Sequence, residues 1–175
     1  MIVTKEVFEW IKTIVISVVI AIVITTFVRP TLVKGHSMYP TLQPNNYLII
    51  NRIPYMLHKP ERGDIVVFKS HLKTLNGKEK DLIKRVIAVE GDRLVIEDGA
   101  AYVNEKKLDE YYVNGSYTSG NVEIIVPKDQ VFVMGDNREN SMDSRDPKVG
   151  TIDIDTIRGK VLVRLFPFSQ IGKVN

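Results

Sequence analysis

The 175-residue chain contains no cysteine and only three histidines. The absence of cysteine excludes disulfide bonds, thiolate metal ligands and a cysteine nucleophile, and it leaves the redox compartment undetermined. Neither sign of charge dominates, because 24 Lys and Arg residues stand against 21 Asp and Glu residues. The basic residues are also scattered, so a nucleic-acid-binding surface is not indicated. With 44% hydrophobic and 26% charged residues, the chain is neither disordered nor a polytopic membrane protein.

The sequence TIVISVVIAIVITTFV, residues 13–28, is strongly apolar and carries no charge. As a helix it would extend about 24 Å, and snorkelling by Lys12 and Arg29 would make up the difference from a hydrocarbon core of about 30 Å. Its all-round apolarity argues against a buried core helix, and the lack of a small-x-small motif argues against a cleaved signal peptide. We expect an uncleaved transmembrane helix at about 11–28, within a membrane anchor formed by residues 1–30. The flanking charges do not determine its orientation.

Beyond this segment the sequence predicts short strands separated by turns. The strand candidates are rich in β-branched and aromatic residues, and they include YLIIN, DIVVF, VEIIVP, QVFVMG and GKVLVRLFPF. Asn76-Gly77 and Asp98-Gly99 are typical of hairpin turns. No helical periodicity of useful length and no internal repeat follows residue 30. We therefore expect a mostly β domain at 31–175.

A basic pair interrupts the apolar strand candidate DLIKRVIAVEGD. Strand alternation places Lys84 on one face and Arg85 on the other. The apolar neighbours on the lysine face are Leu82, Val86 and Ala88. One explanation is an edge strand on which the lysine discourages aggregation. The other is a partly buried lysine, whose pKa is lowered toward neutrality by desolvation, so that its amine becomes a usable general base.

The segment MGDNRENSMDSRD, residues 134–146, is densely polar and follows an apolar strand candidate. Solvated turns of this composition are common. A calcium-binding loop is excluded, because Arg138 and Ser141 occupy positions that need an oxygen ligand and a glycine. What remains is a loop of positioned hydroxyl groups, in which Asp143 and Arg145 are spaced to pair.

Ser37, in the sequence GHSMYPTL, is the candidate nucleophile. A catalytic triad would need a nearby imidazole, but the side chain of His36 diverges from its neighbour, and His58 and His71 lie in polar, loop-like surroundings. The G-x-S-x-G elbow of the α/β-hydrolases is absent. Lys84 is the one lysine within an apolar strand candidate, so a serine–lysine dyad is the remaining arrangement.

Four segments together resemble the type I signal peptidases. GHSMYPTL, RGDIVVF, KRVIAVEGD and GDNRENSMDSR follow the order of that family's sequence boxes between residues 35 and 145, after a single apolar segment. The short chain is similar to the Gram-positive form. The resemblance implies a signal-peptidase-like β catalytic domain with a smaller β subdomain at about 93–130. It also implies a single-pass protein of the cell membrane with its catalytic domain on the extracytoplasmic side.

The same resemblance implies a role for each matching residue. Ser37 matches the nucleophile, Lys84 the general base, and Ser141 the hydroxyl that orients the lysine. The residues matching those that support the dyad or hold the polar loop are Arg85, Gly135, Asp136, Asn137, Asp143 and Arg145. The residues expected to line shallow apolar pockets for the −1 and −3 positions of the substrate are Val33, Met38, Leu42, Leu48 and Ile83.

Two positions depart from the family pattern. Gly35 stands where some members have a serine that donates to the oxyanion, so the Ser37 N–H remains and the second donor is undetermined. Asn45-Asn46 stands where many members have Gly-Asp, which we interpret as alternative turn chemistry.

The resemblance implies a membrane-anchored serine endopeptidase that removes N-terminal signal peptides from secreted precursors. The expected partners are these precursors and the lipid bilayer, with no nucleic acid, metal or cofactor. A self-cleaving serine–lysine repressor protease would carry a DNA-binding helix-turn-helix where this chain has its apolar segment. A catalytically inactive, membrane-tethered scaffold or binding domain has no support in a sequence that contains Ser37, Lys84 and Ser141.

Overall fold

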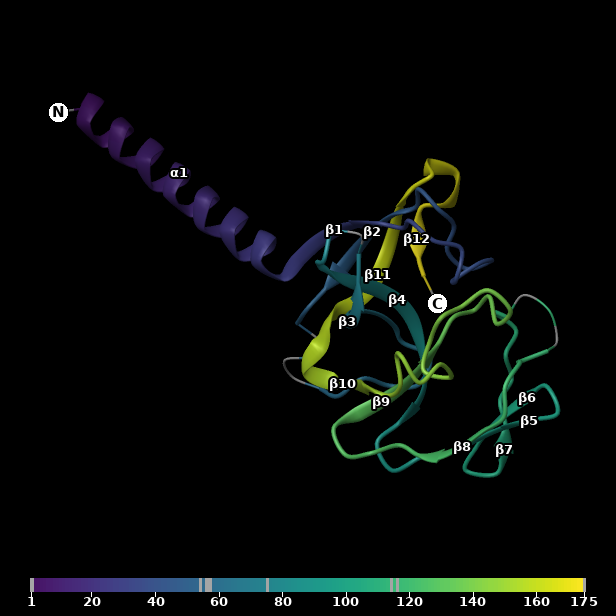
Figure 1. The fold of residues 1–175 in the computed structure, drawn as a ribbon. Helices are drawn as coiled ribbons and strands as arrows, with labels where there is room; N and C mark the ends of the chain where they lie inside the picture. The colour runs from purple at the N-terminus through teal and green to yellow at the C-terminus, as the bar shows by residue number, and fades with distance from the viewer. Residues whose placement is uncertain are drawn as a thin grey trace.

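The computed structural model describes residues 2–53, 55, 58–74, 76–113, 115 and 117–174. One long helix, α1 (Ile2–Phe27), projects away from a body built of two antiparallel β-sheets (Figure 1). The mostly β architecture predicted from the strand and turn pattern is confirmed.

The larger sheet has eight strands, seven of them in the order β1-β2-β11-β3-β4-β9-β10, and β12 pairs with β11. Its strands are β1 (Val28–Leu32), β2 (Tyr47–Asn51), β3 (Ile65–Lys73), β4 (Glu79–Val89), β9 (Gln130–Met134), β10 (Ile152–Asp153), β11 (Ile157–Phe166) and β12 (Gly172–Lys173). Two short 3-10 helices, Ile154–Thr156 and Phe168–Gln170, flank β11.

The smaller sheet has the order β7-β6-β5-β8 and lies within the expected 93–130 segment. Its strands are β5 (Arg93–Glu97), β6 (Ala100–Val103), β7 (Lys106–Lys107) and β8 (Val122–Ile125). The turn between β5 and β6 has positive φ at both Asp98 (48°) and Gly99 (78°), as the type I′ geometry of a two-residue hairpin requires. The hairpin predicted at this dipeptide is confirmed.

Strand β4 pairs with β3 along one side, and from Arg85 onward it also pairs with β9, so only its first part has an open edge. The explanation that Lys84 discourages aggregation from an exposed edge is wrong, because its side chain is buried. Leu82 and Val86 pack in one hydrophobic cluster, while Ile87 and Ala88 pack in another that includes core residues of the smaller sheet. Ala88 was predicted to share the face of Leu82, but a register shift between Val86 and Ala88 turns it to the opposite cluster.

Helix α1 begins earlier than the expected 11–28 span and ends at Phe27. The N-terminal half of the helix contains the charged residues Lys5, Glu6, Glu9 and Lys12. The charge-free part therefore begins only at residue 13, and it extends about 22 Å. Within the described residues, no helix combines the length and the hydrophobicity needed to cross a membrane, so the expected transmembrane span is not found.

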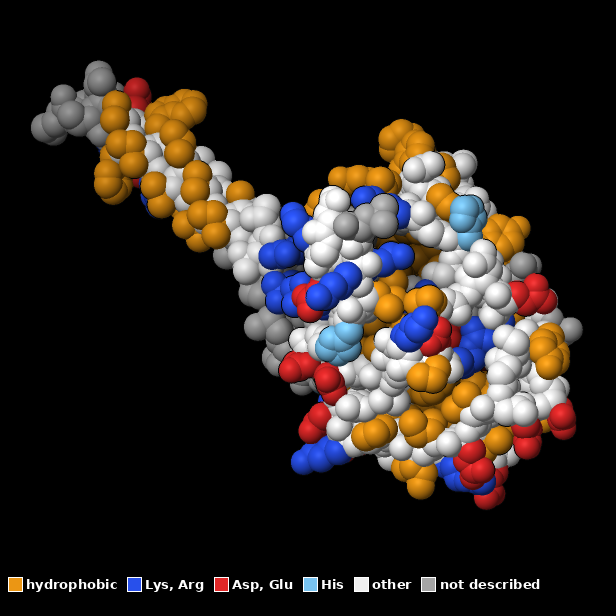
Figure 2. Space-filling view, viewed as in Figure 1, with side chains coloured by type: hydrophobic (Ala, Val, Ile, Leu, Met, Phe, Trp, Pro, Cys, Tyr) orange, Lys and Arg blue, Asp and Glu red, His pale blue; other side chains and the backbone are white. Residues whose placement is uncertain are grey.

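The apolar side chains described along α1 are exposed, and Figure 2 shows them on a helix that stands clear of the body. The first strand follows immediately, since β1 begins at Val28, before the expected domain boundary at residue 31. Strand β1 pairs with β2 along its whole length. The larger sheet therefore includes the residues directly after the helix.

Candidate active site

Ser37 lies in the loop that connects β1 with β2, at the start of a tight turn. The backbone N–H of Tyr39 closes the turn by donating to the carbonyl of His36 at 3.1 Å. Met38 and Leu42 follow as buried side chains, and the N–H of Leu42 donates to the carbonyl of Met38 at 2.8 Å. Residues fixed in the core therefore hold the serine in place.

Lys84 reaches Ser37 from the middle of β4. Its side chain is only 2% exposed, and its Nζ donates a hydrogen bond of 2.6 Å to the Oγ of Ser37. Within the described residues this ammonium forms no ion pair with a carboxylate. Burial lowers the pKa of Lys84 from 10.5 to about 8, although the charge of Asp143 acts in the opposite direction. The second interpretation of the basic pair, a buried lysine with a lowered pKa, agrees with this geometry.

The histidines do not supply an alternative base. His36, His58 and His71 are all exposed. Among the residues that the structure describes, none of the three side chains forms a hydrogen bond with Ser37. The geometry therefore contains a serine–lysine pair and no serine–histidine pair.

The polar loop between β9 and β10 packs directly against the serine turn. The backbone N–H of Asn137 donates to the carbonyl of Ser37 at 3.0 Å, and its side-chain amide donates to the carbonyl of His36 at 3.1 Å. Gly135 lies so close to this turn that a Cβ there would come within 2.3 Å of both the Ser37 carbonyl oxygen and the Ser141 Oγ. Only glycine fits at this approach of the two loops.

Ser141 is brought to this contact, but its predicted bond to Lys84 is not formed. Its Oγ is buried and has no hydrogen-bond partner of ordinary geometry among the described residues. The hydroxyl does contribute to lowering the pKa of Asp143, so it lies near that carboxylate.

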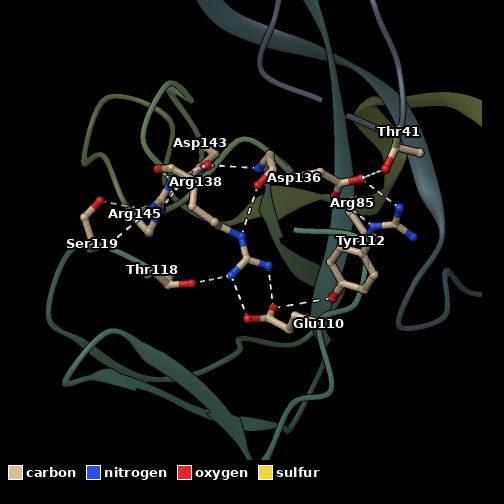
Figure 3. A network of polar contacts seen from close by, with 11 residues as sticks. Thr41, Arg85, Glu110, Tyr112, Thr118, Ser119, Asp136, Arg138, Asp143 and Arg145 are labelled. Carbon is tan, nitrogen blue, oxygen red and sulfur yellow. Dashed lines mark hydrogen bonds and ion pairs between the residues drawn. The ribbon is translucent and has the colours of Figure 1, made fainter. Parts of the chain in front are cut away.

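Asp143 and Arg145 form the predicted pair. The guanidinium donates to both carboxylate oxygens, at 2.8 Å from Nε and 2.9 Å from Nη2 (Figure 3). Asp143 also accepts the N–H of Gly135 at 3.0 Å. Burial alone would raise the pKa of Asp143, but the hydrogen bonds from Arg145 and Gly135 outweigh it and the pKa is lowered. The carboxylate is therefore ionised and ties the end of the loop to its beginning.

Arg85 and Asp136 form a second bidentate pair, with distances of 2.9 and 2.8 Å, and both side chains are buried. The hydroxyl of Thr41 donates to the same carboxylate at 2.5 Å, so the pair also joins the segment after Ser37. The Arg85 guanidinium carbon lies 3.9 Å from the centre of the Tyr112 ring. These contacts fix the start of the polar loop to the strand that carries Lys84.

Sequence reasoning missed the buried cluster formed by Arg138, Glu110 and Thr118. Arg138 lies within the polar loop and was used only to exclude a calcium site, although its guanidinium is almost fully buried. Glu110 and Thr118 come from the connection between β7 and β8. An arginine in a turn is ordinarily exposed, and no local pattern in this connection indicated a partner for it.

A cleft of about 690 Å³ opens beside Ser37. Of the predicted pocket residues, Val33, Met38 and Ile83 contribute to its lining. Leu42 and Leu48 do not line it, because both are completely buried in the hydrophobic cluster that also contains Val33 and Met38. They lie in the core that supports the cleft.

The cleft lies along two strand edges. Strand β1 is at the end of the larger sheet, and its residues 29–32 line the cleft. Residues 79–83 of β4 line it as well. They pair with β3 on one side, and among the described strands no other pairs with them, since the β9 ladder starts at Arg85. Such an edge offers backbone groups to an extended peptide.

A serine hydroxyl bonded to a buried lysine beside such a cleft is the arrangement of a serine–lysine hydrolase. The chain belongs to the family described as "Signal peptidase, peptidase S26", whose profile matches residues 7–166. The resemblance inferred from the four sequence segments is confirmed.

Two relatives compared by sequence agree with the family. The chain is 38% identical to "Signal peptidase IB" of Staphylococcus aureus (strain COL) over 185 residues, covering 95% of this chain and 93% of that protein. It is 43% identical to "Probable signal peptidase I-2" of Synechocystis sp. over 166 residues, covering 92% and 74%. A crystal structure of a signal peptidase I from Enterococcus faecalis V583 aligns with a TM-score of 0.48 and 26% identity, covering 58% of this chain and 96% of that one.

Proposed function

We propose that this protein is a serine endopeptidase that removes N-terminal signal peptides from secreted precursors, with Ser37 as nucleophile and Lys84 as general base. The observation that carries the assignment of the residues is the 2.6 Å contact between the Ser37 Oγ and the buried Lys84 Nζ beside the cleft. Membership of the signal peptidase family supports the reaction and the substrate class. No observation favours an inactive scaffold.

The lowered pKa of Lys84 makes the base available near neutral pH. With a pKa of about 8, about a tenth of the amine is neutral at pH 7, which is roughly 300-fold more than at the ordinary value. The neutral amine takes the proton of Ser37 as Oγ attacks the scissile carbonyl, and the same proton then passes to the departing amine. A water molecule, deprotonated by Lys84, hydrolyses the acyl-enzyme and releases Ser37.

The remaining site residues support this chemistry. Arg85–Asp136 holds the polar loop against β4, and Asp143–Arg145 ties the end of this loop to its beginning. Gly135 and Asn137 hold the loop against the serine turn. The buried Ser141 hydroxyl lies in this contact and is proposed to turn toward Lys84 during the reaction. The backbone N–H of Ser37 is the proposed oxyanion donor.

The cleft would hold the substrate as an extended strand between the edges of β1 and β4. Val33, Met38 and Ile83 are apolar at its floor, which suits small side chains at the −1 and −3 positions. Because the peptide's backbone would be bound along both edges, specificity would come from the limited depth of these pockets.

We also propose that residues 1–30 attach the enzyme to the cell membrane, with the catalytic domain of residues 31–175, including the 93–130 subdomain, on the extracytoplasmic side. The exposed apolar side chains of α1 support this attachment, because such a surface is unfavourable in water. Local thinning of the bilayer and snorkelling of Lys12 and Arg29 would accommodate a short charge-free segment.

The test is cleavage of a signal-bearing precursor in detergent by wild type, Ser37→Ala and Lys84→Ala across a range of pH. Both variants should be inactive, and the wild-type rate should rise with pH as Lys84 loses its proton, reaching half of its maximum near pH 8 and levelling off about one pH unit higher. Alanine at His36, His58 and His71 serves as the matched control and should leave the rate unchanged. Cleavage by Lys84→Ala would show that the base lies elsewhere, and a wild type that cuts nothing would return the scaffold interpretation.

A further inference from the structure

The connection between β7 and β8, residues 108–121, packs against the catalytic loop although it belongs to the smaller sheet. We call the described part of it, residues 108–113, 115 and 117–121, the connecting segment. It contacts three arginines of the elements next to the Ser37–Lys84 pair, namely Arg85 of β4 and Arg138 and Arg145 of the polar loop (Figure 3).

Arg138 is the strongest of these contacts. Its side chain is 1% exposed, and its two terminal nitrogens both donate to the carboxylate of Glu110, with 2.8 Å from Nη1 to Oε2. Nη1 also donates to the Thr118 hydroxyl at 2.6 Å. The remaining contact, from Nε, is to the carbonyl of Gly135 at 3.1 Å. One guanidinium therefore joins the connecting segment to the residue that lies against Ser37.

Two weaker contacts also join the connecting segment to residues near the catalytic pair. Tyr112 places its ring under the guanidinium of Arg85, the neighbour of Lys84 on β4. Arg145 donates to the carbonyl of Ser119 at 3.1 Å while it holds Asp143. The connecting segment thus contacts Arg85 on the strand that carries Lys84, and Arg138 and Arg145 on the polar loop.

We propose that Arg138 and Glu110 are positioning residues for the Ser37–Lys84 pair, and that through them the smaller sheet holds the Gly135 turn against the serine. This inference rests on the proposed function of the pair. It assigns the smaller sheet a part in catalysis, although no residue of that sheet lines the cleft.

Charge compensation of Arg138 and exclusion of water from Lys84 connect Glu110 with the catalytic pair. A buried guanidinium is stable only when a carboxylate compensates it, so removing the Glu110 charge drives Arg138 toward solvent. The carbonyl of Gly135 then loses its donor, and the loop that covers Lys84 loosens. Because burial is what lowers the pKa of Lys84, water entering there raises it.

The test compares the full-length chain with Glu110→Gln, which keeps the shape of the side chain and removes its charge. A matched control is Asp92→Asn, because Asp92 is a carboxylate with little exposure that likewise pairs with an arginine, Arg62, next to the smaller sheet. Cleavage of a signal-bearing precursor gives kcat, KM and the acid limb of kcat/KM, and thermal melting reports the fold.

For Glu110→Gln we expect kcat to fall about tenfold with KM within twofold, and the acid limb to move to higher pH. Asp92→Asn should lower the melting temperature comparably and leave both kcat per folded molecule and the acid limb in place. If Glu110→Gln changes only the melting temperature, the positioning role is overturned.

If Glu110→Gln does not fold, Arg138→Lys replaces it, since a lysine keeps the charge but cannot bond Gly135 and Glu110 together. The same loss of kcat and the same movement of the acid limb support the proposal, and an unchanged acid limb overturns it. Wild type and Ser37→Ala are measured in parallel. A wild type that does not cut, or a Ser37→Ala that does, overturns the proposed function and the positioning role with it.

Discussion

Two neighbouring residues of β4, Lys84 and Arg85, are buried to the same extent, yet the protein surrounds them in opposite ways. Each is 2% exposed. Arg85 has a bidentate carboxylate in Asp136, the carbonyl of Gly63 and the ring of Tyr112, so burial is outweighed and its pKa is raised. Lys84 has a serine hydroxyl and no paired carboxylate within the described residues, so its pKa is lowered.

Burial therefore does not decide whether a basic residue is structural or reactive. The partner decides it, because a carboxylate at bonding distance repays the desolvation of the cation and a hydroxyl does not. On the Arg85 side of β4 the buried charge has a partner, whereas on the Lys84 side burial carries a free-energy penalty, which the general base that we propose would use.

The largest effect should come from Lys84→Met, which fills the same space without an amine. We expect kcat to fall by about 10⁴-fold, because a general base contributes on that order. The free energy of unfolding at pH 7 should be unchanged or higher, since a desolvated cation is removed. Turnover and urea denaturation measure the two quantities. If Lys84→Met lost stability along with activity, the buried charge of Lys84 would not be a cost to folding, and the contrast with Arg85 would be wrong.

The next effect should come from Asp136→Ala, which leaves Arg85 buried without its carboxylate. We expect the free energy of unfolding to fall by about 3–5 kcal/mol. The matched control is Glu123→Ala, which removes an exposed partner of Arg93 and should change stability by less than about 1 kcal/mol. Equal losses in the two variants would mean that the buried pair is not structural.

The pH dependence of stability should sharpen the same comparison. The unfolded chain binds the Lys84 proton with an ordinary pKa of 10.5, and the folded chain binds it with a pKa of about 8, so the unfolded state holds more protons between these values. Stability from this residue therefore rises with pH from about 8 to 10.5, by roughly 3 kcal/mol, and is lowest below pH 8. Other groups also titrate there, so the measurement is the difference in urea denaturation between wild type and Lys84→Met.

The smallest expected effect concerns the oxyanion donor. A Cβ at Gly35 would meet no atom within 4 Å, and the residue does not have a positive φ, so a serine fits there without strain. If the backbone N–H of Ser37 lacks a second donor to the oxyanion, a serine hydroxyl at position 35 would supply it, and Gly35→Ser should raise kcat by up to about tenfold. Gly35→Ala adds the carbon without the hydroxyl and should leave kcat unchanged. A rate increase with alanine as well would indicate a backbone effect.

The sequence predicted what depends on local pattern. Alternation and turn residues predicted β2 at the bounds observed and the turn of the β5–β6 hairpin, whereas the apolar strand containing Lys84 offered a buried amine as one of two explanations. The pairing of Glu110 with Arg138 was not predictable, because it joins residues far apart in the chain and no pattern links them. The Ala88 face was predicted wrongly for a related reason, since the register shift is imposed by pairing with β9 and is not encoded in β4 itself.

The junction between helix and sheet has a mechanical consequence. Phe27 ends α1 and Val28 begins β1, so no residue serves as a flexible tether between them. The strand that continues the helix lines the cleft, and Ser37 follows shortly after it. The junction between α1 and β1 therefore limits how far the serine can lie from the surface that holds the helix. In the membrane-attached enzyme that we propose, the position of the scissile bond relative to the membrane would therefore select substrates in addition to their side chains.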